Sequence, residues 1–190
     1  MVIQMSKDIT IYFSSKEQVI SSGAAALAAA FDYAKNHQIF LPSTTRLLKT
    51  PSGKPYLTNP KIKLSISHSG KYWLAACSVA ELGIDLQQHV DCRREALSRR
   101  FFHPDEYRWL KSQDFKPFFS LWAAKESYAK YTGAGISVFK SFSLVNKQGI
   151  VPKIGRTKLQ IIPFRDGYTL ALCAETIDEI IFKEDFLERV

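Results

Sequence analysis

The segment LWAAKESYAKYT at residues 121–132 has the periodicity of an amphipathic helix that begins near Phe118. At about 100° per residue, its apolar side chains share one broad arc, and Lys125 lies near the middle of that arc. Glu126 lies beside the aromatic side chains, and Lys130 follows it at the i+4 spacing that lets side chains meet. Charges buried among aromatic side chains are costly unless a partner, a metal or a ligand phosphate satisfies them. We therefore interpret this helix as part of a functional site, with an ordinary surface ion pair as the alternative.

Composition limits the class of protein before any motif is considered. The 190 residues are 46% hydrophobic and 13% aromatic, which is enough to bury a core in one domain or two small lobes. The 26 basic and 18 acidic residues give a net charge of +8, which favours an anionic partner. Charge alone does not distinguish nucleotides, nucleic acid, acidic proteins and membrane surfaces.

The three cysteines, Cys77, Cys92 and Cys173, are an odd number and lack the spacing of a metal site. Buried free thiols in a reducing compartment explain them most simply. The N-terminus has no secretory pattern, and the Ala-rich run at 24–30 is too short to span a bilayer. We therefore expect a cytoplasmic protein without a membrane partner.

Strand and helix patterns alternate along the chain, which predicts an α+β fold. Strands are expected near 9–13, 62–67, 72–78, 82–86, 141–145, 158–163, 168–174 and 179–182. Helices are expected over about 16–36, from an N-cap at Asp91 to about Arg100, from the HPDE segment with Pro104 in its first turn, and around Trp122.

Two pairs of similar segments indicate an internal repeat. AAFDYAK at 29–35 resembles AAKESYAK at 123–130, and GKYWLAACS at 70–78 resembles DGYTLALCA at 166–174. The aligned tyrosines are 95 residues apart in the first pair and 96 in the second, close to half the chain. The spacing predicts two pseudo-symmetric lobes, each a small antiparallel sheet packed on helices.

The boundary between these lobes is expected near the end of the strand at 82–86. We divide the chain into an N-terminal lobe at 1–88 and a C-terminal lobe at 89–190. A site between two lobes of one chain needs no second copy, so a monomer is sufficient.

Alternation in LGIDLQ at 82–87 places the apolar side chains on one strand face and Asp85 and Gln87 on the other. A lone aspartate in a strand is commonly exposed or near a turn. However, an oxygen ligand from Asp85 and another from Glu126 would suit Mg²⁺, which takes one or two carboxylates together with waters and substrate phosphates. The strand and the helix can therefore supply one hard-cation site.

Two turn segments offer groups that suit a phosphate. The strand KLSIS runs into a turn with Ser67 and His68 at its end, where hydroxyls, imidazole and backbone make a phosphate-contacting corner. The turn PSGKP at 51–55 presents Lys54. Serine and glycine are also ordinary turn residues, so both segments have a purely structural interpretation.

The motifs taken together resemble the 4′-phosphopantetheinyl transferases of the surfactin-synthetase-activating type. The matching segments are GKP at 53–55, SISHS at 65–69, GIDLQ at 83–87, RFF followed by Glu106, and WAAKES followed by Lys130. Their order and spacing also agree, over roughly residues 45–145. The combination of GID with WxxKES is specific, whereas GKP or SHS alone is weak.

The resemblance implies transfer of the phosphopantetheine arm of coenzyme A to a serine of an acidic acyl or peptidyl carrier protein, releasing 3′,5′-ADP. Asp85 and Glu126 would bind Mg²⁺, with Gln87 as a third candidate ligand. The nucleotide and its phosphates would contact Lys54, Ser67 and His68, while Lys125 and Lys130 would lie at the reacting phosphate. Glu126, or a metal-bound water beside it, would be the base.

One position departs from the family pattern, which commonly has an acid two residues after the aspartate. Gln87 stands there, and its amide can coordinate through oxygen but contributes no charge. A catalytically silent homologue that binds coenzyme A or a carrier protein is therefore one alternative. A nucleic-acid module built on RRFFHPDEYRWLK at 99–111 is the other, but Asp105 and Glu106 interrupt its basic stripe. Whether the pathway makes fatty acids, polyketides or nonribosomal peptides is open.

Overall fold

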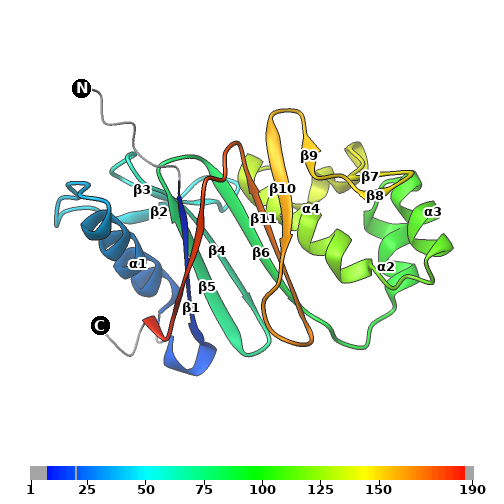
Figure 1. The fold of residues 1–190 in the computed structure, drawn as a ribbon, viewed down its shortest axis with the longest axis horizontal. Coiled ribbons are helices and arrows are strands. Elements are labelled where there is room, and N and C mark those ends of the chain that lie inside the picture. The colour runs from blue at the N-terminus through cyan, green and yellow to red at the C-terminus, as the bar shows by residue number, and fades with distance from the viewer. Residues whose placement is uncertain (1–7, 20, 187–190) are drawn as a thin grey trace.

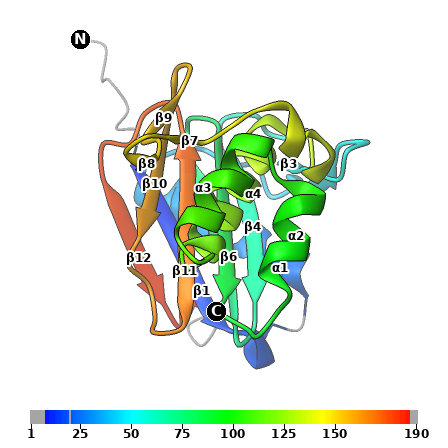
Figure 2. The ribbon, with the colours of Figure 1, turned by 90° about the vertical axis from the view of Figure 1, so that its right-hand side faces the viewer.

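The structure, a computed structural model that describes residues 8–19 and 21–186, has four layers in the order helix, sheet, sheet, helices (Figure 1). The helices are α1 (Ser22–Asn36), α2 (Arg94–Phe101), α3 (Pro104–Ser112) and α4 (Phe118–Thr132), with short 3-10 helices η1 (Lys16–Gln18) and η2 (Ile136–Ser141). α1 covers the outer face of the first sheet, and α4 covers the outer face of the second. α2 and α3 lie beside α4 at one end of the molecule (Figure 2).

In the described residues, each main sheet has four strands. The first sheet has the order β12 (Ile180–Glu184), β1 (Ile9–Ser15), β5 (Tyr72–Ser78), β4 (Lys63–Ser69). The second has the order β6 (Leu82–Gln88), β11 (Tyr168–Ala174), β10 (Thr157–Ile162), β9 (Lys153–Ile154). Two small hairpins are β2 (Leu47–Lys49) with β3 (Pro55–Leu57) and β7 (Val145–Asn146) with β8 (Gly149–Ile150). Apart from the parallel β1–β12 pair, the described pairs are antiparallel, which confirms the α+β class.

The two sheets repeat one arrangement. In the first, β1 precedes α1 and lies next to β5, which pairs with β4; in the second, β6 precedes α4 and lies next to β11, which pairs with β10. The expected lobe boundary after residue 88 differs from this pairing, because β6 joins the second sheet through its seven-residue register with β11. The last described strand, β12, returns to the first sheet beside β1. Each sheet therefore contains one strand from the other side of that boundary, β12 in the first sheet and β6 in the second.

Alternating side chains give the molecule three layers of core. Leu82, Ile84 and Leu86 of β6 belong to the cluster between the two sheets, which confirms the predicted alternation of this strand. The opposite face of the second sheet packs on α4, where Cys173 lies among aromatic side chains. The outer face of the first sheet packs on α1, with Trp73 fully buried. Asp85 lies on the α4 side of β6, away from the inter-sheet core.

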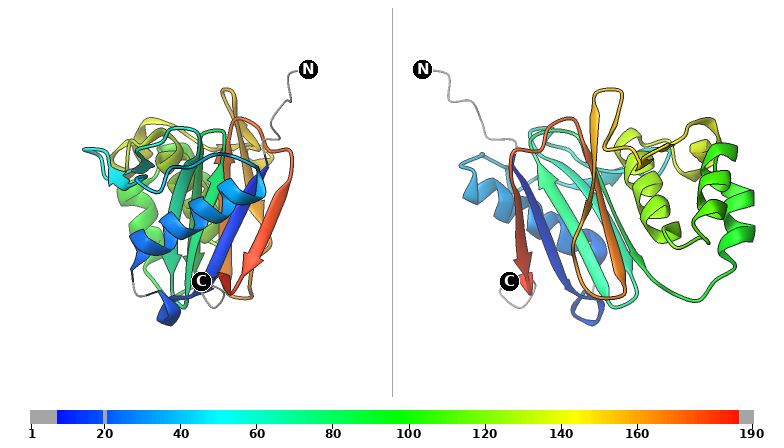
Figure 3. Two further views of the ribbon diagram at one scale, coloured as in Figure 1. Left: turned by 90° about the vertical axis from the view of Figure 1, so that its left-hand side faces the viewer. Right: turned by 45° about the vertical axis from the view of Figure 1, so that its right-hand side comes forward.

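The Ala-rich helix is shorter than predicted. The expected helix over 16–36 is divided, because α1 begins only after Ser21, whose side chain accepts a hydrogen bond from the Ala24 amide and caps the helix. The alanines let α1 lie close against the first sheet (Figure 3). Neither this helix nor any other in the described part of the chain is long and apolar enough to cross a membrane.

Two local predictions were wrong for identifiable reasons. The strand expected at 141–145 is replaced by η2 and the short β7, because the Phe142 carbonyl oxygen and the Leu144 amide bond to the buried side chains of Lys125 and Glu106. Asp91 does not cap α2, which begins at Arg94 with Arg93 at the cap position. The helix from Pro104 has the predicted start, with His103 as its cap.

Candidate active site

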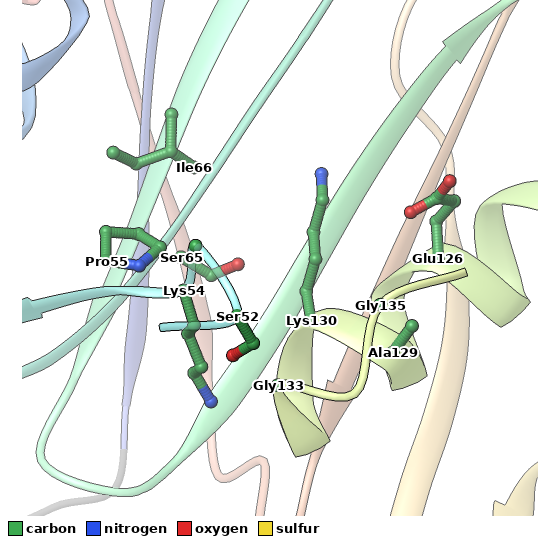
Figure 4. Close-up of a pocket in the computed structure, with 11 residues that line it drawn as sticks. Ser52, Lys54, Pro55, Ser65, Ile66, Glu126, Ala129, Lys130, Gly133 and Gly135 are labelled. Atoms are coloured by element: carbon green, nitrogen blue, oxygen red, sulfur yellow. The ribbon is translucent and has the colours of Figure 1, made fainter. Parts of the chain in front are cut away.

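A pocket of about 190 Å³ lies between the two halves of the molecule. Its walls are the turn at 52–55, Ser65 and Ile66 of β4, the last turns of α4, and the glycines at 133 and 135. Figure 4 shows Glu126 and Lys130 extending from α4 toward the same side, with Lys54 on the facing turn. The pocket therefore collects residues from both repeats.

α4 ends at the pocket because of its glycines. Gly133 is the C-cap of the helix in the left-handed conformation, with φ of 75°, which most other residues adopt only with strain. The backbone then turns along the pocket wall at Gly135. The small side chain of Ala129 leaves room between Glu126 and Lys130. This local sequence presents both charged side chains to the pocket at the i+4 spacing.

Asp85 reaches this region because β6 lies directly on α4. A Cβ at Gly83 would overlap the carbonyl oxygen of Ser127, so only glycine permits this approach. Asp85 is 3% exposed, and its Oδ1 accepts hydrogen bonds from Lys130 Nζ at 2.7 Å and from Ser67 Oγ at 3.0 Å. Burial of this carboxylate is therefore compensated by an ion pair and by hydroxyl donation.

Gln87 faces the same way as Asp85, as the strand alternation predicts. Its Nε2 donates a hydrogen bond to Asp85 Oδ2 at 2.7 Å. The two oxygens of Asp85 thus receive donors from Lys130, Ser67 and Gln87. The amide oxygen of Gln87 does not take part in these bonds and is the atom that a cation would use.

Glu126 is the carboxyl with the most perturbed protonation in the pocket. Burial, and then the negative charge of Asp85, raise its pKa to about 7, while the Lys130 ammonium acts in the opposite direction. Glu126, whose charge is disfavoured in this way, and the neighbouring Asp85 are a suitable donor set for a divalent cation. In the described residues, no set of three His, Cys, Asp or Glu side chains gathers here or elsewhere as a metal site. Gln87 would supply the next oxygen.

Lys54 and Ser67 lie at the site, although Lys54 is already engaged. Its ammonium pairs with Glu81 and donates to the carbonyl oxygen of Tyr131 near the end of α4. The lysine thereby links the β2–β3 turn to the other half of the molecule. Ser67 lies behind the pocket wall, buried between Asp85 and Lys130. Sequence reasoning did not identify Glu81 as the partner of Lys54, because the turn between β5 and β6 carries no motif.

His68 lies apart from this cluster. It lies on β4, directly opposite Trp73 of β5. Its side chain is exposed and does not line the pocket. The neighbouring Ile66, on the same strand face, packs beside the α1 core. Contact between His68 and a nucleotide therefore stays a prediction that requires the ligand to extend beyond the pocket.

Lys125 differs most from its expected position. Its side chain is fully buried, and its ammonium contacts the Glu106 carboxylate at 2.8 Å, the Phe142 carbonyl oxygen at 2.9 Å and the face of the Phe142 ring. Burial lowers the pKa of Lys125, and Glu106 opposes that shift. Lys125 is directed into the helical core rather than toward the pocket, because Glu106 satisfies its charge there. Glu106 also accepts hydrogen bonds from the backbone amides of His103 and Leu144, a role that the sequence did not reveal.

Comparison with known proteins gives matches to one family. Residues 81–173 match the 4′-phosphopantetheinyl transferase superfamily. This likeness covers just under half of the chain. It is 36% identical over 110 residues to the 4′-phosphopantetheinyl transferase psf-1 of Bacillus pumilus, covering 53% of this chain and 46% of that protein. It is 31% identical over 145 residues to the 4′-phosphopantetheinyl transferase Sfp of Bacillus subtilis strain 168, covering 70% of this chain and 63% of that protein.

A third relative, the 4′-phosphopantetheinyl transferase gsp of Aneurinibacillus migulanus, is 35% identical over 96 residues, covering 47% of this chain and 39% of that protein. The chain thus spans less than two thirds of the length of these superfamily members. The matched segment at 81–173 contains Asp85, Glu126 and Lys130 but not Lys54 or Ser67. These matches confirm the resemblance drawn from the motifs.

Proposed function

We propose that the chain transfers the 4′-phosphopantetheine arm of coenzyme A to a serine of an apo acyl or peptidyl carrier protein and releases 3′,5′-ADP. The observation that supports this most directly is that Glu126 and Lys130 line one pocket between the repeats, with Asp85 buried behind them and bonded to Lys130. In a phosphoryl transfer the protein chiefly positions the reactants and stabilises charge. Two carboxylates and an ammonium in this arrangement suit that task.

The lysines of the pocket would bind the phosphates. Lys130 is 30% exposed and already lies on a carboxylate, so it can contact an incoming phosphate oxygen without losing its buried partner. Lys54 contributes a second ammonium from the facing turn once its pair with the partly exposed Glu81 is exchanged for a phosphate. These cations would stabilise the charge that develops on 3′,5′-ADP as its bond to the arm breaks.

Asp85 and Glu126 would hold Mg²⁺, with the Gln87 amide oxygen as a third ligand. A bound Mg²⁺ would supply positive charge at the pyrophosphate and would offset both the burial and the Asp85 charge that raise the pKa of Glu126. The proton of the carrier serine needs an acceptor on the same side. Glu126 can take it directly or through a water that it orients, because it lies at the pocket beside Lys130.

Arginines at the start of α2 and along it would form a surface complementary to an acidic carrier protein. A shallow cavity of about 690 Å³ lies among Arg93, Arg94, Arg99 and Arg100. We call these four residues the arginine surface. With a net charge of +8, such a surface would speed encounter with an acidic partner. All walls of the pocket come from the same chain, so a monomer would be sufficient for the reaction.

Transfer is tested by incubating the protein with an apo carrier protein, coenzyme A and Mg²⁺, and recording the mass of the carrier. The proposal expects a gain of one phosphopantetheine arm and release of 3′,5′-ADP. Asp85→Asn should abolish most of the gain, whereas Asp166→Asn, on the exposed turn before β11, is the matched control. Coenzyme A binding without any mass gain on several carriers would instead indicate a silent homologue.

A further inference from the structure

Three serines of β4 hydrogen bond to the backbone of β6. The amides of Ile84, Leu86 and Gln88 donate to the hydroxyls of Ser65, Ser67 and Ser69 at 3.1, 3.1 and 2.9 Å. Each pair is 19 residues apart, so the two strands run parallel in a fixed register. We call these three bonds the serine seam.

The seam joins two sheet edges. β4 is the last strand of the first sheet and β6 is the first strand of the second. The outward amides of an edge strand need acceptors, and an exposed row of them invites pairing with another chain. On β6 those amides meet serine hydroxyls instead of a backbone ladder. The two sheets are therefore connected by side chains at the edge where they approach each other.

Serine suits all three positions for one physical reason. The side chains at 64 and 66 of β4 point to the α1 core, so the alternate positions at 65, 67 and 69 face β6. A hydroxyl on a single carbon supplies an acceptor at short range without separating the strands. The close approach continues past Ser69, because a Cβ at Gly70 would overlap the side chains of Gln88 and Tyr168.

The seam also sets the geometry of the pocket. The central serine, Ser67, bonds to the Leu86 amide, to Asp85 Oδ1 and to Lys130 Nζ. Ser65 lines the pocket on the β4 side, and β6 carries Asp85 on the other side. β6 in turn lies directly on α4 at Gly83. The separation of β4 from β6 therefore fixes how far the β4 wall stands from the carboxylates and from Lys130.

From these contacts we propose that the outer seam residues, Ser65 and Ser69, are positioning residues for coenzyme A. They hold the nucleotide side of the pocket, on β4 and the 52–55 turn, at a fixed distance from Asp85 and α4. Ser69 does not line the pocket, so its effect on binding must pass through the separation of the strands. This role rests on the proposed function, whereas the seam itself does not.

The first arm of the test measures the seam by amide hydrogen exchange, with the variants Ser69→Ala and Ser69→Thr. Alanine should speed exchange at the Gln88 amide by roughly tenfold or more and leave the Ile84 amide little changed, since one hydroxyl serves one amide. Threonine keeps a hydroxyl on the Cβ and should restore protection. Equal exchange at Gln88 in all three proteins would overturn the seam.

The second arm measures coenzyme A binding by calorimetry, without a carrier protein. Ser69→Ala should raise the dissociation constant at least about threefold, because small displacements of binding groups weaken simultaneous contacts. Ser69→Thr should restore it, and Ser98→Ala, which removes a buried hydroxyl on α2 away from the pocket, should not change it. Unchanged binding in Ser69→Ala would overturn the positioning role. Absence of binding in the wild type would overturn the proposed function, and this role with it, while the exchange result would still stand.

Discussion

The ammonium of Lys130 lies 2.7 Å from the Asp85 carboxylate, so a side chain of α4 neutralises a buried side chain of β6 at the pocket wall. Asp85 is almost fully buried and Lys130 is partly exposed, which leaves the lysine able to face a ligand. Close packing at Gly83 is what brings the two elements together. The pair therefore connects the fold to the proposed chemistry.

Removing one carboxylate charge should strongly reduce the transfer. Asp85→Asn and Glu126→Gln keep the size of each side chain but lose the negative charge that would hold Mg²⁺. Each variant should lower kcat/KM by about a hundredfold, the scale for loss of a charge-stabilising group. Thermal melting checks that both variants fold. Near-normal turnover in either folded variant would rule out the proposed site.

The two lysines of α4 should behave in opposite ways. Lys125→Met leaves the buried Glu106 carboxylate without its counter-ion, which should lower the free energy of unfolding by about 3–5 kcal/mol. Lys130→Met removes a partly exposed ammonium and leaves Asp85 with hydrogen bonds from Ser67 and Gln87, so it should lower that free energy by less than Lys125→Met does, but it should lower kcat/KM by about a hundredfold. Urea unfolding and transfer assays on both variants separate the roles.

The contrast would fail if Lys125→Met were as stable as the wild type and lost transfer only. That result would restore Lys125 to the reacting phosphate, where the sequence placed it. Lys61→Met, an exposed lysine outside the pocket, is the matched control for both measurements.

The sequence carried most of the fold because its strands and helices have clear periodicity. Alternation in LGIDLQ predicted which side chains of β6 face the inter-sheet core, and Pro104 marked the start of α3. The division at residue 88 differed from the sheet pairing, because periodicity shows that a strand exists but not which strand it pairs with. The parallel return of β12 to β1 was hidden for the same reason.

The site was predictable where a motif fixed both residue and spacing. Asp85, Glu126 and Lys130 lie together as expected. However, helical phase alone could not decide that Lys125, rather than Glu126, is directed into the core by an ion pair. That answer required Glu106, nineteen residues earlier and on another helix. The alternating serines SxSxS at 65–69 were visible, but their function depends on a strand that only the structure places beside them.

The buried thiols should make stability fall in alkaline solution. Burial raises the pKa of Cys173 from its ordinary value of 9.0 to about 12, and burial likewise raises the pKa of Cys77. The folded thiols keep their protons where the unfolded thiols lose them, so their contribution to stability is complete below about pH 9 and declines above it. Each thiol should account for a loss of roughly 1 kcal/mol between pH 8 and pH 10.

Urea unfolding at pH 8 and pH 10 tests this dependence. Cys173→Ala should lose about 1 kcal/mol less than the wild type over that range, and Cys77→Ala should behave in the same way. Additivity in the double variant would support independent thiols. An identical pH dependence in wild type and double variant would show that other groups cause the alkaline loss.

Charge on the arginine surface should affect encounter with the carrier more than the chemical step. Arg100→Glu should lower kcat/KM for the carrier about tenfold in low salt and leave kcat nearly unchanged. The difference from wild type should shrink as salt rises from about 20 mM to about 500 mM, because the Debye length falls. Lys35→Glu, on α1 at the other end of the molecule, is the matched charge reversal. Equal salt dependence in both variants would assign no role to this surface.

Gln87 provides the sharpest test of the metal proposal, because its Nε2 donates to Asp85 Oδ2 at 2.7 Å. Gln87→Glu replaces that donor with a second carboxylate facing the first. Without a cation, the lost hydrogen bond and the new repulsion should lower the melting temperature by several degrees, in line with a loss of about 1–2 kcal/mol. With Mg²⁺, the same two charges should instead favour the cation.

We therefore expect Gln87→Glu to reverse its effect on stability as Mg²⁺ is added: less stable than the wild type in a chelator, and more strongly stabilised by the metal. Near charges interact by more than about 1 kcal/mol even at an effective dielectric constant of about 20, so the Mg²⁺ concentration giving half-maximal rate should fall at least about threefold. The rate at saturating metal should change less, because the added charge also faces the pyrophosphate of coenzyme A. Melting curves and Mg²⁺ titrations of both proteins at fixed coenzyme A measure the two effects separately. A lower melting temperature with an unchanged Mg²⁺ midpoint would mean that Gln87 supports Asp85 by its hydrogen bond alone and does not face the metal.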